Sequence, residues 1–155
     1  MIDLYIILLA LVVYTYIGYP LIIVVISKVY QKKSTLDTSY RPTVSWVVPS
    51  YNEEDIIADK IKNLLALDYP KELLEIIIIT DGSSDNTPKV AATFDEVKVL
   101  HEDARNGKSA AENRAMKFVS SEVVVFNDAN TIVSSNALLD IVKHYADPRV
   151  GGVSG

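Results

Sequence analysis

The first apolar stretch of the chain is unbroken, because no charged residue occurs between Asp3 and Lys28. As an α-helix this stretch spans roughly 36 Å, enough to cross a ~30 Å hydrocarbon core with some tilt. It is too long for the apolar core of a signal peptide, and it has no polar face with which to lie along a membrane surface. We therefore predict a transmembrane anchor helix over residues 1–30, kinked near Gly18 by Pro20.

Basic residues follow this anchor, whereas only Asp3 precedes it; they are Lys28, Lys32, Lys33 and Arg41. Positively charged flanks stay on the cytoplasmic side of a membrane. The sequence thus predicts a single-pass protein of the cell membrane with its globular part in the cytoplasm. Residues 31–42 are polar and are predicted to form a linker, and the lysines suit contact with anionic membrane lipid.

From residue 43 onward, short apolar runs alternate with stretches of helical periodicity. Strands are predicted over Val44–Val48, Glu75–Thr80, Val97–Leu100 and Val123–Phe126. Helices are predicted over Ile56–Leu65, from Thr87 onward, over Lys108–Val119 and over Ala137–Tyr145. This alternation is typical of an α/β domain, with a Rossmann-like, mostly parallel sheet covered by helices on both faces. Val150–Val153 is predicted to begin a further strand, so we expect the domain over 43–155 to be truncated at its C-terminus.

Composition narrows the classes of function. The 155-residue chain contains no Cys, which excludes a disulfide scaffold and thiolate chemistry. Its hydrophobic fraction of 49% excludes intrinsic disorder. The formal net charge of -5 argues against a nucleic-acid partner, because neutralising phosphates requires clustered Lys and Arg.

Polar residues gather where three predicted strands end, in the segments Pro49–Glu53, Asp81–Asp85 and Asn127–Asn130. The carboxyl ends of parallel strands meet at one edge of a sheet, and ligands bind there. Any one of these carboxylates can be explained as part of a turn or as a helix cap. Carboxylates at the ends of three strands on one edge of the sheet, however, predict a ligand site. Asp128 and Asn130, separated by a single residue, also suit a hard cation that holds phosphate oxygens.

Two common nucleotide-binding motifs do not fit this sequence. Gly107-Lys108-Ser109 resembles the end of a P-loop, but Glu102 stands where that motif requires Gly. No G-x-G-x-x-G follows the first strand, which disfavours a dinucleotide oxidoreductase. Lys108, at the start of a predicted helix, remains a candidate phosphate contact.

Four ordered motifs resemble family 2 glycosyltransferases of the GT-A fold, which include hyaluronan and poly-N-acetylglucosamine synthases. They are VVPSYNEE (47–54), TDGSSDNT (80–87), NGKSAAENRAM (106–116) and VVFNDANT (124–131). The resemblance implies a nucleotide-binding domain in which Pro49, Tyr51, Glu53, Asp81, Lys108 and Asp128 bind a nucleotide-sugar donor. It further implies that Asp128 and Asn130 hold a divalent metal, Mg or Mn. Asn130 stands where the family often has a carboxylate.

The reaction implied by the resemblance is inverting transfer of a sugar, expected to come from a UDP-sugar, in cell-surface polysaccharide synthesis. The acceptor is expected to be a glycan or a lipid. The catalytic base of the family lies in a later motif that this sequence lacks, so no catalytic residue is predicted here and only the donor-binding half is expected. The alternative is a non-catalytic nucleotide-sugar-binding module, or a degenerate fragment without turnover.

Overall fold

The structure, a computed structural model, describes residues 2–30 and 35–155, which include two compact units divided after Ser34. In the first unit, α1 (Ile2–Val13) and α2 (Tyr19–Val29) are joined by a π-helical turn, Tyr14–Gly18. The run Ile2–Val29 is long and apolar enough to cross a membrane, and none of its residues is buried.

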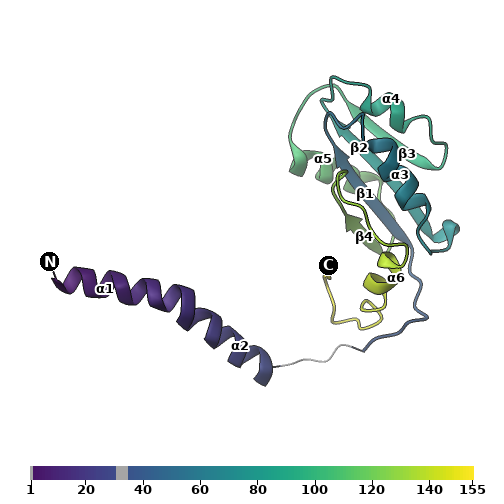
Figure 1. Ribbon diagram of the computed structural model, residues 1–155. Helices are drawn as coiled ribbons and strands as arrows, with labels where there is room; N and C mark the ends of the chain where they lie inside the picture. Colours follow the sequence, from purple (N-terminus) through teal and green to yellow (C-terminus); the bar gives the residue numbers. More distant parts are fainter. Residues whose placement is uncertain (1, 31–34) are drawn as a thin grey trace. The chain divides into compact units, whose positions relative to one another are not determined.

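The π turn lies where the sequence predicts a kink. Pro20 has no N–H to donate to the Tyr16 carbonyl, and the preceding Tyr19 N–H bonds to the Tyr14 carbonyl, five residues back. The helix therefore continues through the proline, but it bends at this turn, as Figure 1 shows. Gly18 suits this position because a Cβ there would come within 3.1 Å of the Tyr14 ring.

In the second unit the described residues form one four-stranded sheet in the order β3-β2-β1-β4. Every strand pair is parallel, which confirms the predicted fold class. The strands are β1 (Val44–Ser50), β2 (Leu74–Asp81), β3 (Val97–Glu102) and β4 (Val123–Phe126). The helices are α3 (Ile57–Leu65), α4 (Thr87–Ala91), α5 (Lys108–Ala115) and α6 (Ala137–Val142), with 3₁₀ turns at Lys71–Leu73 and Met116–Phe118.

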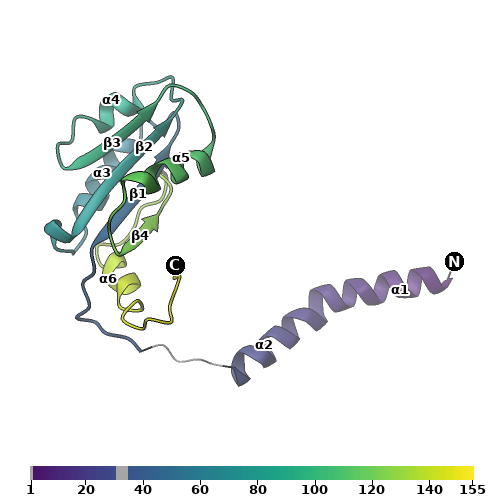
Figure 2. The same ribbon diagram turned by 180° about the vertical axis from the view of Figure 1, so that it is seen from behind.

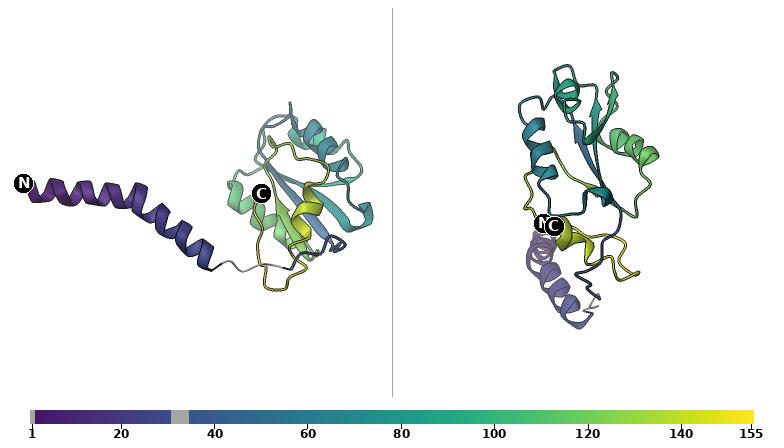
Figure 3. Two further views of the ribbon diagram at one scale, coloured as in Figure 1. Left: turned by 60° about the horizontal axis from the view of Figure 1, so that its bottom comes forward. Right: turned by 90° about the vertical axis from the view of Figure 1, so that its right-hand side faces the viewer.

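Alternating side chains of the central strands build two apolar cores, one on each face of the sheet. Trp46 and Val48 of β1 pack in a cluster with residues of α3, α4 and α6. Val47, between them, packs on the opposite face with residues of β2 and α5, including Ala111 and Ala115. Figures 2 and 3 show α5 and α3 on opposite faces of the sheet. The small alanines let α5 approach the sheet closely.

Strand β1 runs through Pro49 to Ser50, whereas the sequence predicts its end at Val48. Pro49 lies beside Ile79 of β2, but the pairing of β1 with β4 stops at Val47 and Phe126. The carbonyl of Val47 faces β4, where it accepts a hydrogen bond from Asn127 N–H. The backbone nitrogen of Pro49, two residues further along β1, points to the same side, where β4 has already ended. The missing N–H of Pro49 therefore costs no hydrogen bond of the sheet.

Two other expectations differ from the structure. Residues 149–155 have no regular secondary structure, so the strand predicted at Val150–Val153 is wrong. The prediction of this strand depended only on Val150 and Val153, which flank two glycines. Residues 35–42, predicted as linker, belong to the second compact unit, where Thr35 N–H donates to Asp147 and Asp37 N–H to the Lys143 carbonyl. Residues 31–34 of the predicted linker lie outside the described residues.

Candidate functional site

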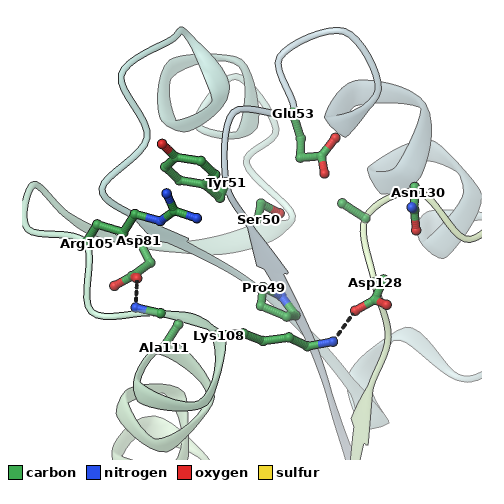
Figure 4. Close-up of a pocket in the computed structure, with 12 residues that line it drawn as sticks. Pro49, Ser50, Tyr51, Glu53, Asp81, Arg105, Lys108, Ala111, Asp128 and Asn130 are labelled. Carbon is green, nitrogen blue, oxygen red and sulfur yellow. Dashed lines mark hydrogen bonds and ion pairs between the residues drawn. The ribbon is translucent and has the colours of Figure 1, made fainter.

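A pocket of about 370 Å³ opens at the carboxyl ends of β1, β2 and β4. It contains all seven residues that the sequence analysis selected: Pro49, Tyr51, Glu53, Asp81, Lys108, Asp128 and Asn130. Figure 4 shows them converging from three strand ends and from the first residue of α5. The parallel topology thus brings together residues up to about eighty positions apart in the chain.

Asp81 ends β2 and is 5% exposed. Its Oδ2 accepts hydrogen bonds from the backbone N–H groups of Asn106 (2.8 Å) and Gly107 (2.6 Å). Its Oδ1 is buried without a hydrogen-bond partner, although Arg114 Nη1 lies 3.6 Å away. Asp81 therefore fixes the loop before α5 with one oxygen, while the other accepts no hydrogen bond and lies within ion-pair distance of Arg114.

The loop held by Asp81 depends on two glycines. Gly107 has φ +90°, a conformation that residues with a Cβ rarely adopt. Gly82 has φ +68°, and a Cβ on it would lie 2.8 Å from the backbone of Arg105. This close approach brings the Arg105 guanidinium over the Tyr51 ring, 3.8 Å from the ring centroid. The stacked Tyr51 and Arg105 side chains therefore lie on the same side of the pocket as Asp81 (Figure 4).

The segments after β1 and β2 are joined by hydrogen bonds. Glu53 N–H donates to Thr87 Oγ1, and Glu54 N–H donates to Asp85. Burial alone raises the pKa of Asp85, but hydrogen bonds from Thr87 and Glu54 lower it overall. Glu53 itself extends its carboxylate toward the pocket (Figure 4). The sequence predicts a turn or cap role for Asp85, and its Oδ1 accepts hydrogen bonds from the N–H and the hydroxyl of Thr87 at the start of α4, in agreement.

Lys108 and Asp128 form an ion pair, with 2.6 Å between Nζ and Oδ1. The hydrogen bond to Asp128 raises the pKa of Lys108, so the ammonium form is favoured. Asn130 lines the same end of the pocket. Among residues 2–30 and 35–155, no three His, Cys, Asp or Glu side chains are grouped as a metal site. Asp128 and Asn130 fit a hard cation only if a phosphate-bearing ligand supplies further oxygens.

Three polar residues at or beside the pocket lie outside the predicted set. Ser50 has a buried hydroxyl without a partner, and Arg105 stacks on Tyr51. Arg114 contacts Asp81, forms an ion pair with Glu102 and donates to the Thr80 carbonyl. Ser50 directly follows Pro49 and was within reach of sequence reasoning. Arg105 and Arg114 carried no signal, because their contacts depend on loop and helix packing.

A parallel sheet whose strand ends line such a pocket is the arrangement of nucleotide-binding α/β proteins. The sequence profile described as "Glycosyl transferase family 2" matches residues 45–155. The chain therefore belongs to glycosyltransferase family 2, as the motifs predicted.

Similar proteins agree with this assignment. The chain is 38% identical over 118 residues to a beta-monoglucosyldiacylglycerol synthase of Trichormus variabilis, covering 72% of this chain and 25% of that protein. It is 37% identical over 129 residues to a poly-beta-1,6-N-acetyl-D-glucosamine synthase of Staphylococcus aureus, covering 80% and 31%. The chain thus spans less than a third of the length of these two relatives.

Two solved structures share the fold. A mannosyltransferase of Pyrobaculum calidifontis, in complex with GDP-Man and Mn²⁺, matches with a TM-score of 0.79 and 34% identity, over 89% of this chain and 43% of that one. Residues 1–349 of S. aureus TarS, in complex with UDP-GlcNAc, match with a TM-score of 0.60 and 27% identity, over 63% of this chain and 29% of that one. These GT-A glycosyltransferases carry different nucleotides.

Proposed function

We propose that the pocket binds the nucleotide of a UDP-sugar together with a divalent metal, as the donor site of a membrane-anchored glycosyltransferase. The observation that carries this proposal is Asp81, a carboxylate that lines the pocket and whose Oδ1 is buried and accepts no hydrogen bond, with only Arg114 Nη1 at 3.6 Å. A buried acceptor without a partner is costly, and a ligand N–H removes that cost. The relatives' names supply the reaction class.

The hydrogen bonding of Asp81 favours uracil over guanine. Oδ2 already accepts two backbone N–H bonds, so the carboxylate presents a single free acceptor. Uracil offers one N–H donor on its pairing edge, whereas guanine offers two adjacent donors that suit both oxygens of a carboxylate. The ring of Tyr51 supplies a stacking surface beside this acceptor, and such stacking contributes about 1–3 kcal/mol per base.

The opposite end of the pocket suits a diphosphate. Lys108 is a cation at the first residue of α5, where backbone N–H groups also favour negative charge. Asp128 and Asn130 are the residues that would hold Mg²⁺ or Mn²⁺, with diphosphate oxygens completing the coordination. When bound, such a metal stabilises the charge that develops on the leaving diphosphate. None of the described residues is assigned as the base that deprotonates the acceptor.

The remaining assignments concern the rest of the enzyme and its place in the cell. We assign the Ile2–Val29 helix as the membrane anchor, with the second unit on the cytoplasmic side, where nucleotide sugars are available. The glycolipid and polysaccharide synthases among the relatives support a lipid or a growing glycan as acceptor.

Calorimetry of the full chain in detergent micelles tests the donor assignment. UDP with Mn²⁺ should bind more tightly than GDP with Mn²⁺, and omission of the metal should weaken UDP binding. The variant Asp128→Asn should lose the metal effect. The matched control Asp140→Asn, on α6 and outside this pocket, should behave like the unmodified chain. Tighter binding of GDP would overturn the assignment of uracil, and no binding of either nucleotide would overturn the site.

A further inference from the structure

A lysine lies on the buried face of α3. The helix packs Ile57, Ile61 and Leu64 against the sheet, and Lys60 lies between them on the same face, with 0% of its surface exposed. Lysine is almost never fully buried unless its charge is paired, because removing an ammonium from water costs several kcal/mol. Methionine, of similar length, would fill this position without that cost. The charge of Lys60 therefore requires an explanation beyond packing.

The two acceptors of Lys60 identify what it holds. Its Nζ donates to the side-chain Oδ1 of Asn127 and to the backbone carbonyl of Thr131. These residues lie immediately before and after the segment that carries Asp128 and Asn130. The segment follows β4 and has no helix or strand of its own, so no ladder of backbone hydrogen bonds fixes it.

A second polar side chain of α3 holds the chain slightly further on. Asn63, one turn after Lys60, donates to the Val133 carbonyl at 2.8 Å and accepts from the Val133 N–H at 3.0 Å. Lys60 and Asn63 thus contact the same irregular segment at two separate points. Only the Lys60 contacts enclose Asp128 and Asn130.

We propose that Lys60 is a positioning residue, whose ammonium joins Asn127 to Thr131 and thereby holds Asp128 and Asn130 in the geometry that binds metal. This inference rests on the proposed function, because it assumes that these two residues meet a metal and a diphosphate. Burial lowers the pKa of Lys60 to about 8, and the charge of Asp128 opposes that shift. The ammonium form therefore predominates at neutral pH.

Amide hydrogen exchange of the full chain in micelles, without metal or nucleotide, tests the positioning itself. The Thr131 N–H bonds to the Asp128 carbonyl at 3.2 Å, so its exchange rate reports on the turn. In Lys60→Met, Thr131 should exchange about tenfold faster or more, while the amide of Ile78 in β2 is unchanged. In the matched control Asn63→Ala, Val133 should exchange faster and Thr131 should not. Unchanged exchange of Thr131 in Lys60→Met would overturn the proposal.

Mn²⁺ titration in the presence of UDP, followed by electron paramagnetic resonance, tests the consequence for the site. Lys60→Met should bind Mn²⁺ about tenfold more weakly, a factor that equals about 1.4 kcal/mol. Asn63→Ala should bind within about twofold of the unmodified chain, a difference of about 0.4 kcal/mol.

If Lys60 acted only as a nearby positive charge, its removal would tighten Mn²⁺ binding. Tighter binding, or unchanged binding, would overturn the proposal. If the unmodified chain bound neither UDP nor Mn²⁺, the proposed function would fail, and the exchange of Thr131 would still decide the role of Lys60.

Discussion

The ammonium of Lys108 lies 2.6 Å from Oδ1 of Asp128, so the first residue of α5 contacts the segment after β4 across the mouth of the pocket. Both side chains are more than half exposed, and exposed ion pairs contribute only about 0–1 kcal/mol. A ligand can therefore separate this pair at little cost. Lys108 is then free to contact a phosphate and Asp128 to contact a metal.

Removal of Lys108 should change metal and nucleotide affinity in opposite directions. In Lys108→Met, Asp128 loses its competing partner, so Mn²⁺ alone should bind several-fold more tightly, a gain within about 1 kcal/mol. UDP should bind about tenfold or more weakly, because a charge-assisted phosphate contact is lost. Calorimetry measures both. Lys98→Met, which removes an exposed lysine paired with Glu75 elsewhere on the sheet, is the control and should change neither. Weaker binding of both ligands would contradict the two separate roles.

Substitution of Asn130 by a carboxylate should tighten metal binding. Asn130→Asp adds a negative charge to a site that has only the Asp128 carboxylate, and cation affinity rises with the charge of the ligands. Repulsion between the two carboxylates and the loss of hydration offset part of this gain. We expect about tenfold tighter binding of Mn²⁺ to the UDP complex, or about 1.4 kcal/mol. Asn113→Asp, an equal change of charge on the exposed face of α5, should have no effect. Equal affinity for both variants would remove Asn130 from the metal site.

The lowered pKa of Lys60 predicts an unusual dependence of stability on pH. The folded-state pKa of about 8 lies below the ordinary 10.5, so between these values the unfolded chain holds a proton that the folded chain has released. The free energy of unfolding therefore rises with pH in this window, by at most about 3 kcal/mol. Chemical denaturation at pH 7, 8, 9 and 10 measures it as the difference between the unmodified chain and Lys60→Met, which cancels other titrating groups. A difference that stays constant with pH would contradict the assigned pKa.

The orientation of the anchor can be tested with single cysteines, because the chain has none. Thr38 is exposed and donates no side-chain hydrogen bond, whereas the neighbouring Ser39 bonds to Asp37. Thr38→Cys should resist an impermeant thiol reagent in intact cells and react after lysis. Ile2→Cys, at the other end of the helix, should react in intact cells. The reverse pattern would place the second unit outside the cytoplasm.

Most of the fold could be predicted from the chain because its signals are local. The four isoleucines at 76–79 lie in the buried strand β2, and the short apolar run at Val123–Phe126 forms the edge strand β4, so runs of apolar residues locate both strands. The pocket residues could be predicted because they directly follow these strands. The strand predicted at 150–153 failed because so short a run, flanked by glycines, does not specify a structure.

The contacts that hold the site could not be predicted in the same way. Arg105 reaches Tyr51 only because Gly82 lets two loops approach, and Arg114 reaches Asp81 through the packing of α5 on the sheet. Lys60 did leave a signal, since it falls on the apolar face between Ile57 and Ile61. A charged residue inside an apolar stripe indicates a buried polar contact, although the spacing does not reveal its partner.

The most direct test of the uridine site exchanges the free acceptor of Asp81 for a donor. In Asp81→Asn the amide oxygen must accept the Asn106 and Gly107 N–H bonds, which places the amide NH₂ at the position of Oδ1. An NH₂ there repels the N–H of uracil but can donate to the ring nitrogen of cytosine. Calorimetry with UDP and CDP should show that the unmodified chain prefers UDP. The variant should lose about tenfold or more in UDP affinity, about 1.5–3 kcal/mol, and bind CDP as well as or better than UDP. An unchanged preference for UDP in the variant would contradict the claim that Asp81 contacts the base.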